Sequence, residues 1–151
     1  MAMVFTYGLG VFLIPKFMSQ TFALKASAVL GIIFTFCIVF TTGFTSILFV
    51  AGLGIANALV WPAVWPLTLK GLGKFTKTAS ALLIMAIAGG AIIPPIYGNL
   101  VDGHRVDLIA QGMSEAAATA QAATSGYWIL LPCYLIILYY AIAGHKLGLK
   151  K

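Results

Sequence analysis

The chain alternates between long apolar runs and short polar connections. Four runs are each long enough, as helices, to cross a hydrocarbon core of about 30 Å, which takes roughly 20 residues. They cover residues 22–41, 44–69, 79–101 and 126–144. A fifth apolar run, residues 1–14, falls short of the roughly 17 residues that a span requires, so we expect it to be the end of a truncated helix. The pattern predicts an all-α fold, a polytopic transmembrane helix bundle forming a single membrane domain.

Charged residues are scarce and lie almost entirely between these runs. Apolar residues make up 62% of the chain and charged residues 8%, whereas a soluble domain averages about 25% charged residues. Such a chain cannot hide its apolar surface from water, so the lipid bilayer must be its solvent. The net charge is +6, but the basic residues are scattered singly over short loops. That distribution argues against nucleic acid as a partner.

The signs of the charges predict an orientation in the membrane. If the connection after residue 14 is cytoplasmic, eight of the nine basic residues share that side, as the positive-inside rule requires. The other side then receives Arg105 and all three acids, within an extracytoplasmic loop at 102–125. Within that loop, Ser114 followed by Glu115 predicts the start of a short helix. The tail, residues 145–151, is predicted to be cytoplasmic.

The apolar runs contain no carboxylate and no histidine. They therefore offer no general acid or base, no activated nucleophile and no set of metal ligands. We expect the chain to have no enzymatic activity, no catalytic residue, no metal site and no cofactor.

One polar group stands out at membrane depth. Asn57 lies near the middle of the 44–69 run, and Trp61 and Trp65 follow at helical spacing on the same face. An amide beside aromatic rings is a usual way to hold a sugar, so these three residues are candidate substrate-binding residues. A structural alternative remains open. Asn57 can instead bond to a neighbouring helix, which is worth about 0.6 kcal/mol on average, and Trp65 can be an interfacial anchor.

Prolines and glycines interrupt two of the runs. Each proline removes a backbone donor and favours a kink, and the paired glycines favour close helix packing more than ligand contact. The candidate kink and packing positions are Pro62, Pro66, Gly89, Gly90, Pro94 and Pro95.

The stretch 57–102 closely resembles the tenth and eleventh helices of the fucose–galactose–glucose symporter family, within the major facilitator superfamily. The resemblance is strongest to bacterial glucose/galactose transporters. Its specific part is Trp61-Pro62…Lys70-Gly71-Leu72-Gly73…Thr76-Lys77…Ser80-Ala81 and Gly89-Gly90-Ala91…Pro94. In the same register, residues 1–14 correspond to the eighth helix, 22–41 to the ninth and 126–144 to the twelfth. The chain therefore looks like a C-terminal fragment, the last five helices of a twelve-helix fold.

The resemblance implies secondary active transport of a hexose, glucose or galactose, across the bacterial inner membrane by cation-coupled alternating access. It implies a sugar substrate, a coupling cation (H+) and the missing N-terminal half of the transporter as partners, and it makes Asn57 and Trp61 cavity-facing positions. Fucose or another sugar of the same family is an alternative substrate. A membrane anchor or assembly subunit without transport is the alternative of another class, and an intramembrane enzyme is a more distant one.

Overall fold

A computed structural model describes residues 4, 6–8, 10 and 18–146 of the chain. Within these residues every regular element is a helix, which confirms the all-α prediction. Four helical stretches are long and apolar enough to cross a membrane, in agreement with the predicted transmembrane bundle. They are Gln20–Phe40, Gly43–Leu69, Gly73–Ala110 and Glu115–Ile142. Most of the predicted helix end at 1–14 and most of the tail at 145–151 lie outside the described residues.

Most of these stretches are built from more than one helix. The α-helices are α2 (Gln20–Phe40), α3 (Gly43–Ala58), α4 (Val60–Leu69), α5 (Thr76–Ala86), α6 (Gly89–Ala110), α7 (Glu115–Gly126) and α8 (Leu130–Ile142). Short 3₁₀ turns cover Gly73–Phe75, Tyr127–Ile129 and Gly144–Lys146. The turn Tyr127–Ile129 joins α7 to α8 without a break in direction, while short interruptions separate α3 from α4 and α5 from α6.

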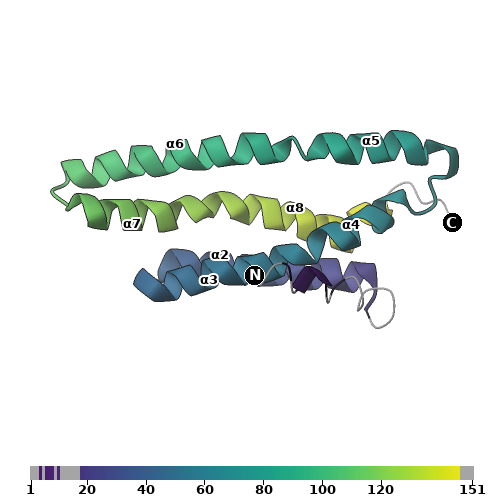
Figure 1. Cartoon of the computed structure of the whole chain (residues 1–151), viewed down its shortest axis with the longest axis horizontal. Coiled ribbons are helices and arrows are strands. Elements are labelled where there is room, and N and C mark those ends of the chain that lie inside the picture. Colours follow the sequence, from purple (N-terminus) through teal and green to yellow (C-terminus); the bar gives the residue numbers. More distant parts are fainter. Residues whose placement is uncertain (1–3, 5, 9, 11–17, 147–151) are drawn as a thin grey trace.

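The helices run side by side along the long axis of the molecule. Figure 1 shows α5 and α6 as one long layer, α7 and α8 beneath it, and α2 and α3 on the far side of α7 and α8. Small residues line the central contact, where Ala23, Ala63 and Ala141 of α2, α4 and α8 are fully buried together with Leu24. Small side chains let helix backbones approach closely, which in lipid is a main source of packing energy.

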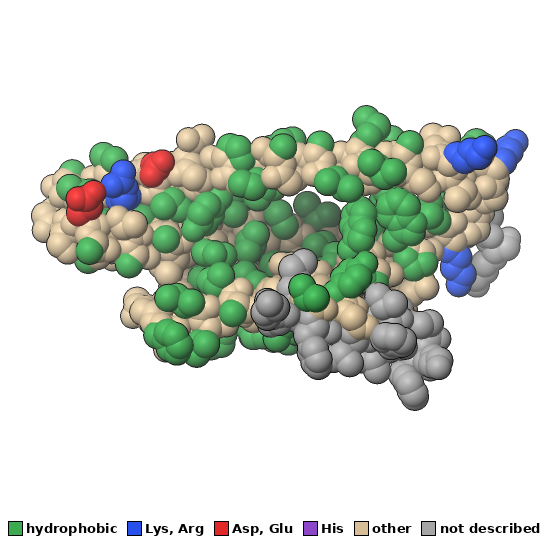
Figure 2. Space-filling view, in the orientation of Figure 1, with side chains coloured by type: hydrophobic (Ala, Val, Ile, Leu, Met, Phe, Trp, Pro, Cys, Tyr) green, Lys and Arg blue, Asp and Glu red, His purple; other side chains and the backbone are tan. Residues whose placement is uncertain are grey.

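Large apolar side chains cover much of the outer surface. Ile33 is 48% exposed, Leu82 60% and Ile136 68%, and such residues would be buried in a soluble domain. Charged side chains gather instead at the two ends of the long axis, basic ones at one end and the acidic ones at the other (Figure 2). Arg105 lies with the acids, 3.9 Å from Asp102 and 3.5 Å from Glu115. This distribution is expected of a helix bundle that is embedded in lipid and exposed to water at its two ends.

The segment 102–125, expected as a loop that contains a short helix from about Ser114, is helical over most of its length. α6 continues to Ala110, a turn follows with Gly112 at a φ of 90°, and α7 begins at Glu115. Ser114 occupies the N-cap position, but its side chain makes no capping hydrogen bond. Alanine-rich sequence favours helix, and the two helices pack through Leu108, Ala118 and Ala122. The side of the membrane on which this hairpin lies stays a prediction.

Candidate functional site

The three candidate substrate-binding residues flank an interruption in the Gly43–Leu69 span. Asn57 lies in the last turn of α3, and Trp61 and Trp65 lie in α4. Asn57 is exposed, and the ring of Trp61 is 40% exposed. The opposite face of α4 packs on the core through fully buried Ala63 and its neighbour Val60. Asn57 lies near the middle of the span Gly43–Leu69, whereas Trp65 lies four residues before its end. The exposed side of α4, which carries Trp61, faces away from the core shared with α2 and α8.

The helix is interrupted at Leu59 for a local reason. Pro62 has no backbone N–H, so it cannot bond to the Ala58 carbonyl four residues earlier. The structure begins a new helix at Val60, which puts Pro62 in the first turn of α4, where a missing donor is tolerated. The backbone N–H of Leu59 donates to the Asn57 carbonyl oxygen. Pro66 lies inside α4, where it frees the Pro62 carbonyl.

The Asn57 side chain makes one interhelical hydrogen bond. The hydroxyl of Tyr134, on α8, donates to the Asn57 Oδ1 at 3.0 Å. This is the kind of helix-to-helix bond that the structural alternative for Asn57 requires. It uses only the amide oxygen, and no second hydrogen bond of this side chain occurs among the described residues. The Nδ2 group therefore keeps both of its N–H donors for another partner.

The two tryptophans form an aromatic pair one helical turn apart. Their ring centroids are 5.6 Å apart and their planes are inclined by 53°. An inclined pair of this kind presents both flat apolar faces and ring edges on one side of α4. Asn57 lies four residues before Trp61 in the chain, so an N–H donor group and an aromatic surface occur within about one helical turn of sequence. These are group types that suit the hydroxyls and C–H groups of a sugar.

The second interrupted span lies in α5 and α6. Ile87 and Ala88 form the break, and the backbone around it uses tight three-residue hydrogen bonds such as Ile87 N–H to Ile84 O at 3.0 Å. Gly89 and Gly90 begin α6, and Pro94 and Pro95 lie inside it. The roles of these residues and of Pro62 and Pro66 as flexing points stay predictions.

The glycines differ in their surroundings. A Cβ at Gly89 or Gly90 would meet no atom within 4 Å, so no described element packs closely there. Close approach occurs instead at Gly52, where a Cβ would lie 3.2 Å from the Phe34 ring, and at Gly31, where it would overlap the Tyr134 ring. Sequence reasoning did not single out Gly31 or Tyr134. The signal available in the sequence was Gly31 itself, a glycine inside the apolar run 22–41, which is typical of a close helix contact.

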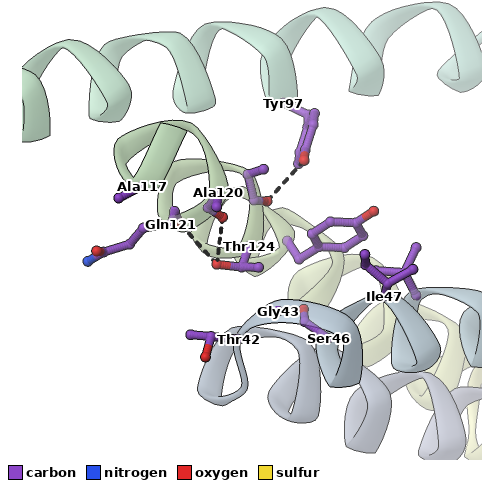
Figure 3. A pocket seen from close by; sticks show the side chains of 12 residues that line it. Thr42, Gly43, Ser46, Ile47, Tyr97, Ala117, Ala120, Gln121 and Thr124 are labelled. Carbon is purple, nitrogen blue, oxygen red and sulfur yellow. Dashed lines mark hydrogen bonds between the residues drawn. The ribbon is translucent and has the colours of Figure 1, made fainter. Parts of the chain in front are cut away.

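A cavity lies away from these residues. It has a volume of about 650 Å³ and opens between the α2–α3 turn, α6 and α7 (Figure 3). Three of its hydroxyl groups are engaged locally: Ser46 donates to the Ile38 carbonyl, Tyr97 to the Ala123 carbonyl and Thr124 to the Gln121 carbonyl. The wall is otherwise mainly apolar, and Thr42, Gln121 and Tyr127 add further polar side chains to it. Asn57, Trp61 and Trp65 do not line it.

A metal site is not formed by the part of the chain that the structure describes. No three His, Cys, Asp or Glu side chains come together there. The groups that the candidate site offers are an amide, indole rings and a tyrosine hydroxyl, which bind by hydrogen bonding and stacking.

Comparison of the amino-acid sequence with curated proteins relates this chain to sugar transporters. The chain is 32% identical over 124 residues to a glucose/galactose transporter of Brucella abortus, which covers 82% of the chain and 26% of that protein. It is 34% identical over 93 residues to a putative glucose/galactose transporter of Helicobacter pylori, covering 62% of the chain and 20% of the relative. The predicted membership of the fucose–galactose–glucose symporter family is confirmed.

Relatives within this symporter family carry more than one sugar name. An L-fucose-proton symporter of Haemophilus influenzae is 27% identical over 143 residues, covering 90% of the chain and 28% of that protein. The chain thus spans about a quarter of the length of the curated relatives it matches. No family model and no solved structure matches it. The relatives are transporters and symporters rather than enzymes, in agreement with the prediction of a non-enzymatic chain.

Proposed function

We propose that this chain forms one wall of the sugar site in a cation-coupled hexose transporter. Glucose or galactose is the proposed substrate, because relatives from two genera carry that name. A proton is the proposed coupling cation, because the more distant relatives are named proton symporters. The rest of the site, and the group that couples sugar to the cation, would come from protein outside this chain, the N-terminal half of the transporter.

The observation that carries the proposal is the amide and indole pair at an interrupted mid-membrane helix. Irregular backbone at membrane depth is tolerated where it lines a cavity or is buried in protein. Transporter substrate sites commonly lie at such interruptions near the midplane. In this arrangement Asn57 would donate to sugar hydroxyls, while Trp61 and Trp65 would cover the apolar face of the ring.

The breaks at Leu59 and at Ile87–Ala88 suit the bending that alternating access needs. In this proposal the two interrupted spans flex while the core of α2 and α8 stays packed. The described spans hold no carboxylate near the candidate site, and we expect the chain alone not to transport. Uptake of hexose by liposomes that contain only this chain would refute that expectation.

The proposed location is the bacterial inner membrane, with the chain crossing it several times and its C-terminus in the cytoplasm. The lysines at one end of the molecule and the acids at the other support this orientation, since positive charge favours the cytoplasmic side.

A graft tests the function. The part of the Brucella abortus relative that matches is replaced by this chain, and uptake of labelled glucose, galactose and L-fucose into liposomes is measured. We expect uptake of glucose or galactose. Asn57→Leu should lower apparent affinity about tenfold, because a lost hydrogen bond is worth about 1 to 1.5 kcal/mol.

The matched control is Asn99→Leu, the same chemical change in α6, at a residue that forms no hydrogen bond among those described. Equal uptake by both variants and by the unsubstituted graft would remove Asn57 from the site and favour the anchor or assembly role. Preference for L-fucose would keep the transport function but change its substrate.

A second pair, Trp61→Phe and Trp128→Phe, compares two tryptophans that are each 40% exposed. Only the Trp61 change should weaken hexose uptake.

A further inference from the structure

The Asn57 amide is held from one side by α8. Its Oδ1 accepts the hydrogen bond from the Tyr134 hydroxyl, which links the last turn of α3 to the middle of a helix that lies 77 residues further along the chain. The bond lies next to the break at Leu59, where α3 ends and α4 begins at Val60. It therefore connects the end of α3 to α8 at the point where the span is interrupted.

The supporting ring is itself rigidly seated. Tyr134 is only 3% exposed and packs in a cluster with Ile38 and Leu53. Gly31 leaves the space on α2 that the ring fills, since a Cβ there would overlap it. A ring enclosed in this way has few alternative rotamers, so the position of its hydroxyl is well defined.

This hydrogen bond decides what Asn57 offers to a ligand. The terminal torsion of an asparagine is broad and roughly two-fold, so a free amide can present either its oxygen or its nitrogen. A tyrosine hydroxyl that donates to Oδ1 selects one of these orientations. The Nδ2 group, with two N–H donors, is then left for another partner, on an exposed residue four positions before Trp61.

We propose that Tyr134 is a positioning residue that makes Asn57 a hydrogen-bond donor to a hydroxyl oxygen of the bound hexose. This inference rests on the proposed function, because it assigns the orientation of a group in that site. Tyr134 acts through Asn57 and does not touch the sugar. The site thereby selects ligands that present an acceptor oxygen at that point.

α8 supplies a matched control for this role. The Tyr140 hydroxyl is 2.7 Å from Thr68 Oγ1, so a second tyrosine of the same helix bonds to α4, on the other side of the break. Tyr134→Phe and Tyr140→Phe each remove one hydroxyl and one interhelical bond. A merely structural role predicts similar consequences for both variants, whereas positioning of Asn57 predicts that only Tyr134→Phe changes hexose recognition.

The experiment uses the graft in the Brucella abortus relative, placed in lipid nanodiscs, because it contains the rest of the proposed site. The side-chain amide of Asn57 is followed by NMR during titration with D-galactose and D-glucose. We expect hexose to shift the Asn57 amide signals in the unsubstituted graft. Tyr134→Phe should raise the midpoint of that titration about tenfold, by the loss of an orienting hydrogen bond, and Tyr140→Phe should leave it unchanged. Retained helical circular dichroism shows that each variant is folded.

The outcomes separate the two proposals. Absence of any hexose effect on Asn57 in the unsubstituted graft counts against the hexose site itself and removes the basis of this inference. A hexose effect that is the same in Tyr134→Phe overturns the positioning role alone. Equilibrium dialysis then compares the hexose affinity of Asn57→Ala with that of the double variant Asn57→Ala with Tyr134→Phe. If Tyr134 acts only through the amide, the second substitution should cause no further loss of affinity. Additive losses of affinity would contradict that.

Discussion

Tyr134 of α8 fills the space in which a side chain at Gly31 of α2 would lie. A Cβ at Gly31 would overlap three atoms of the Tyr134 ring, so the absence of a side chain there allows α8 to lie against α2. The same contact brings the Tyr134 hydroxyl to the Asn57 amide on α3. One glycine thus connects the packing of the bundle to the geometry of the candidate site.

The first prediction concerns this contact. Gly31→Ala should destabilise the bundle by about 1 to 3 kcal/mol, because the ring must shift in a tightly packed core. Thermal unfolding in detergent measures the effect. Gly98→Ala is the control, since a Cβ in that part of α6 meets nothing within 4 Å. It should be neutral or stabilising by up to about 1 kcal/mol. Equal destabilisation by both changes would show that Gly31 is not a packing glycine.

A second prediction concerns the break in the Gly43–Leu69 span. Pro62→Ala restores an N–H that can bond to the Ala58 carbonyl, so α3 and α4 should join into one helix across Leu59. Hydrogen exchange of the backbone at 59–63 should slow, and sugar uptake by the graft should fall because a bend is lost. Pro132→Ala is the control, since Pro132 lies in the first turn of α8. Unchanged exchange at 59–63 would mean that Pro62 does not cause the break.

The α6–α7 hairpin leads to a third prediction. Arg105 is 3.5 Å from Glu115, but the Glu115 side chain is 78% exposed, so Glu115→Gln should change stability by less than about 1 kcal/mol. Ala122 is fully buried against α6, and Ala122→Leu should destabilise the hairpin by about 1 to 3 kcal/mol through overpacking. Limited proteolysis near Gly112 reports the difference. A larger effect from the charge change than from the core change would contradict this account.

The proposed orientation leads to a fourth prediction. After Cys37 and Cys133 are replaced by alanine, Gln111→Cys is placed in the α6–α7 turn and Lys74→Cys at the opposite end of the span. A membrane-impermeant maleimide added to intact cells should label the first variant, and should label the second only after the membrane is permeabilised. The reverse pattern would invert the proposed topology and with it the cytoplasmic C-terminus.

Much of this fold follows from hydrophobic run length alone. The runs 22–41 and 44–69 agree with α2 and with α3–α4 to within two residues. The reason is that a backbone in lipid must satisfy its own hydrogen bonds, which favours apolar helix over the full thickness of the hydrocarbon core. In the segment 102–125, Ser114 and Glu115 predict the start of a short helix, and α7 begins at Glu115. Run length does not predict that α6 continues to Ala110, where the packing of Leu108 with Ala118 and Ala122 favours a helical hairpin.

The sequence by itself determined that this is a bundle of membrane-spanning helices, that it resembles sugar symporters, and that Asn57, Trp61 and Trp65 follow one another at helical spacing within one apolar run. These conclusions need only local periodicity, composition and motif spacing. Only the tertiary structure decided which partner Asn57 has. The Tyr134 hydroxyl reaches it because Gly31 admits the ring between helices far apart in the chain. Such a contact depends on how helices pack, and no pattern within a single helix encodes it.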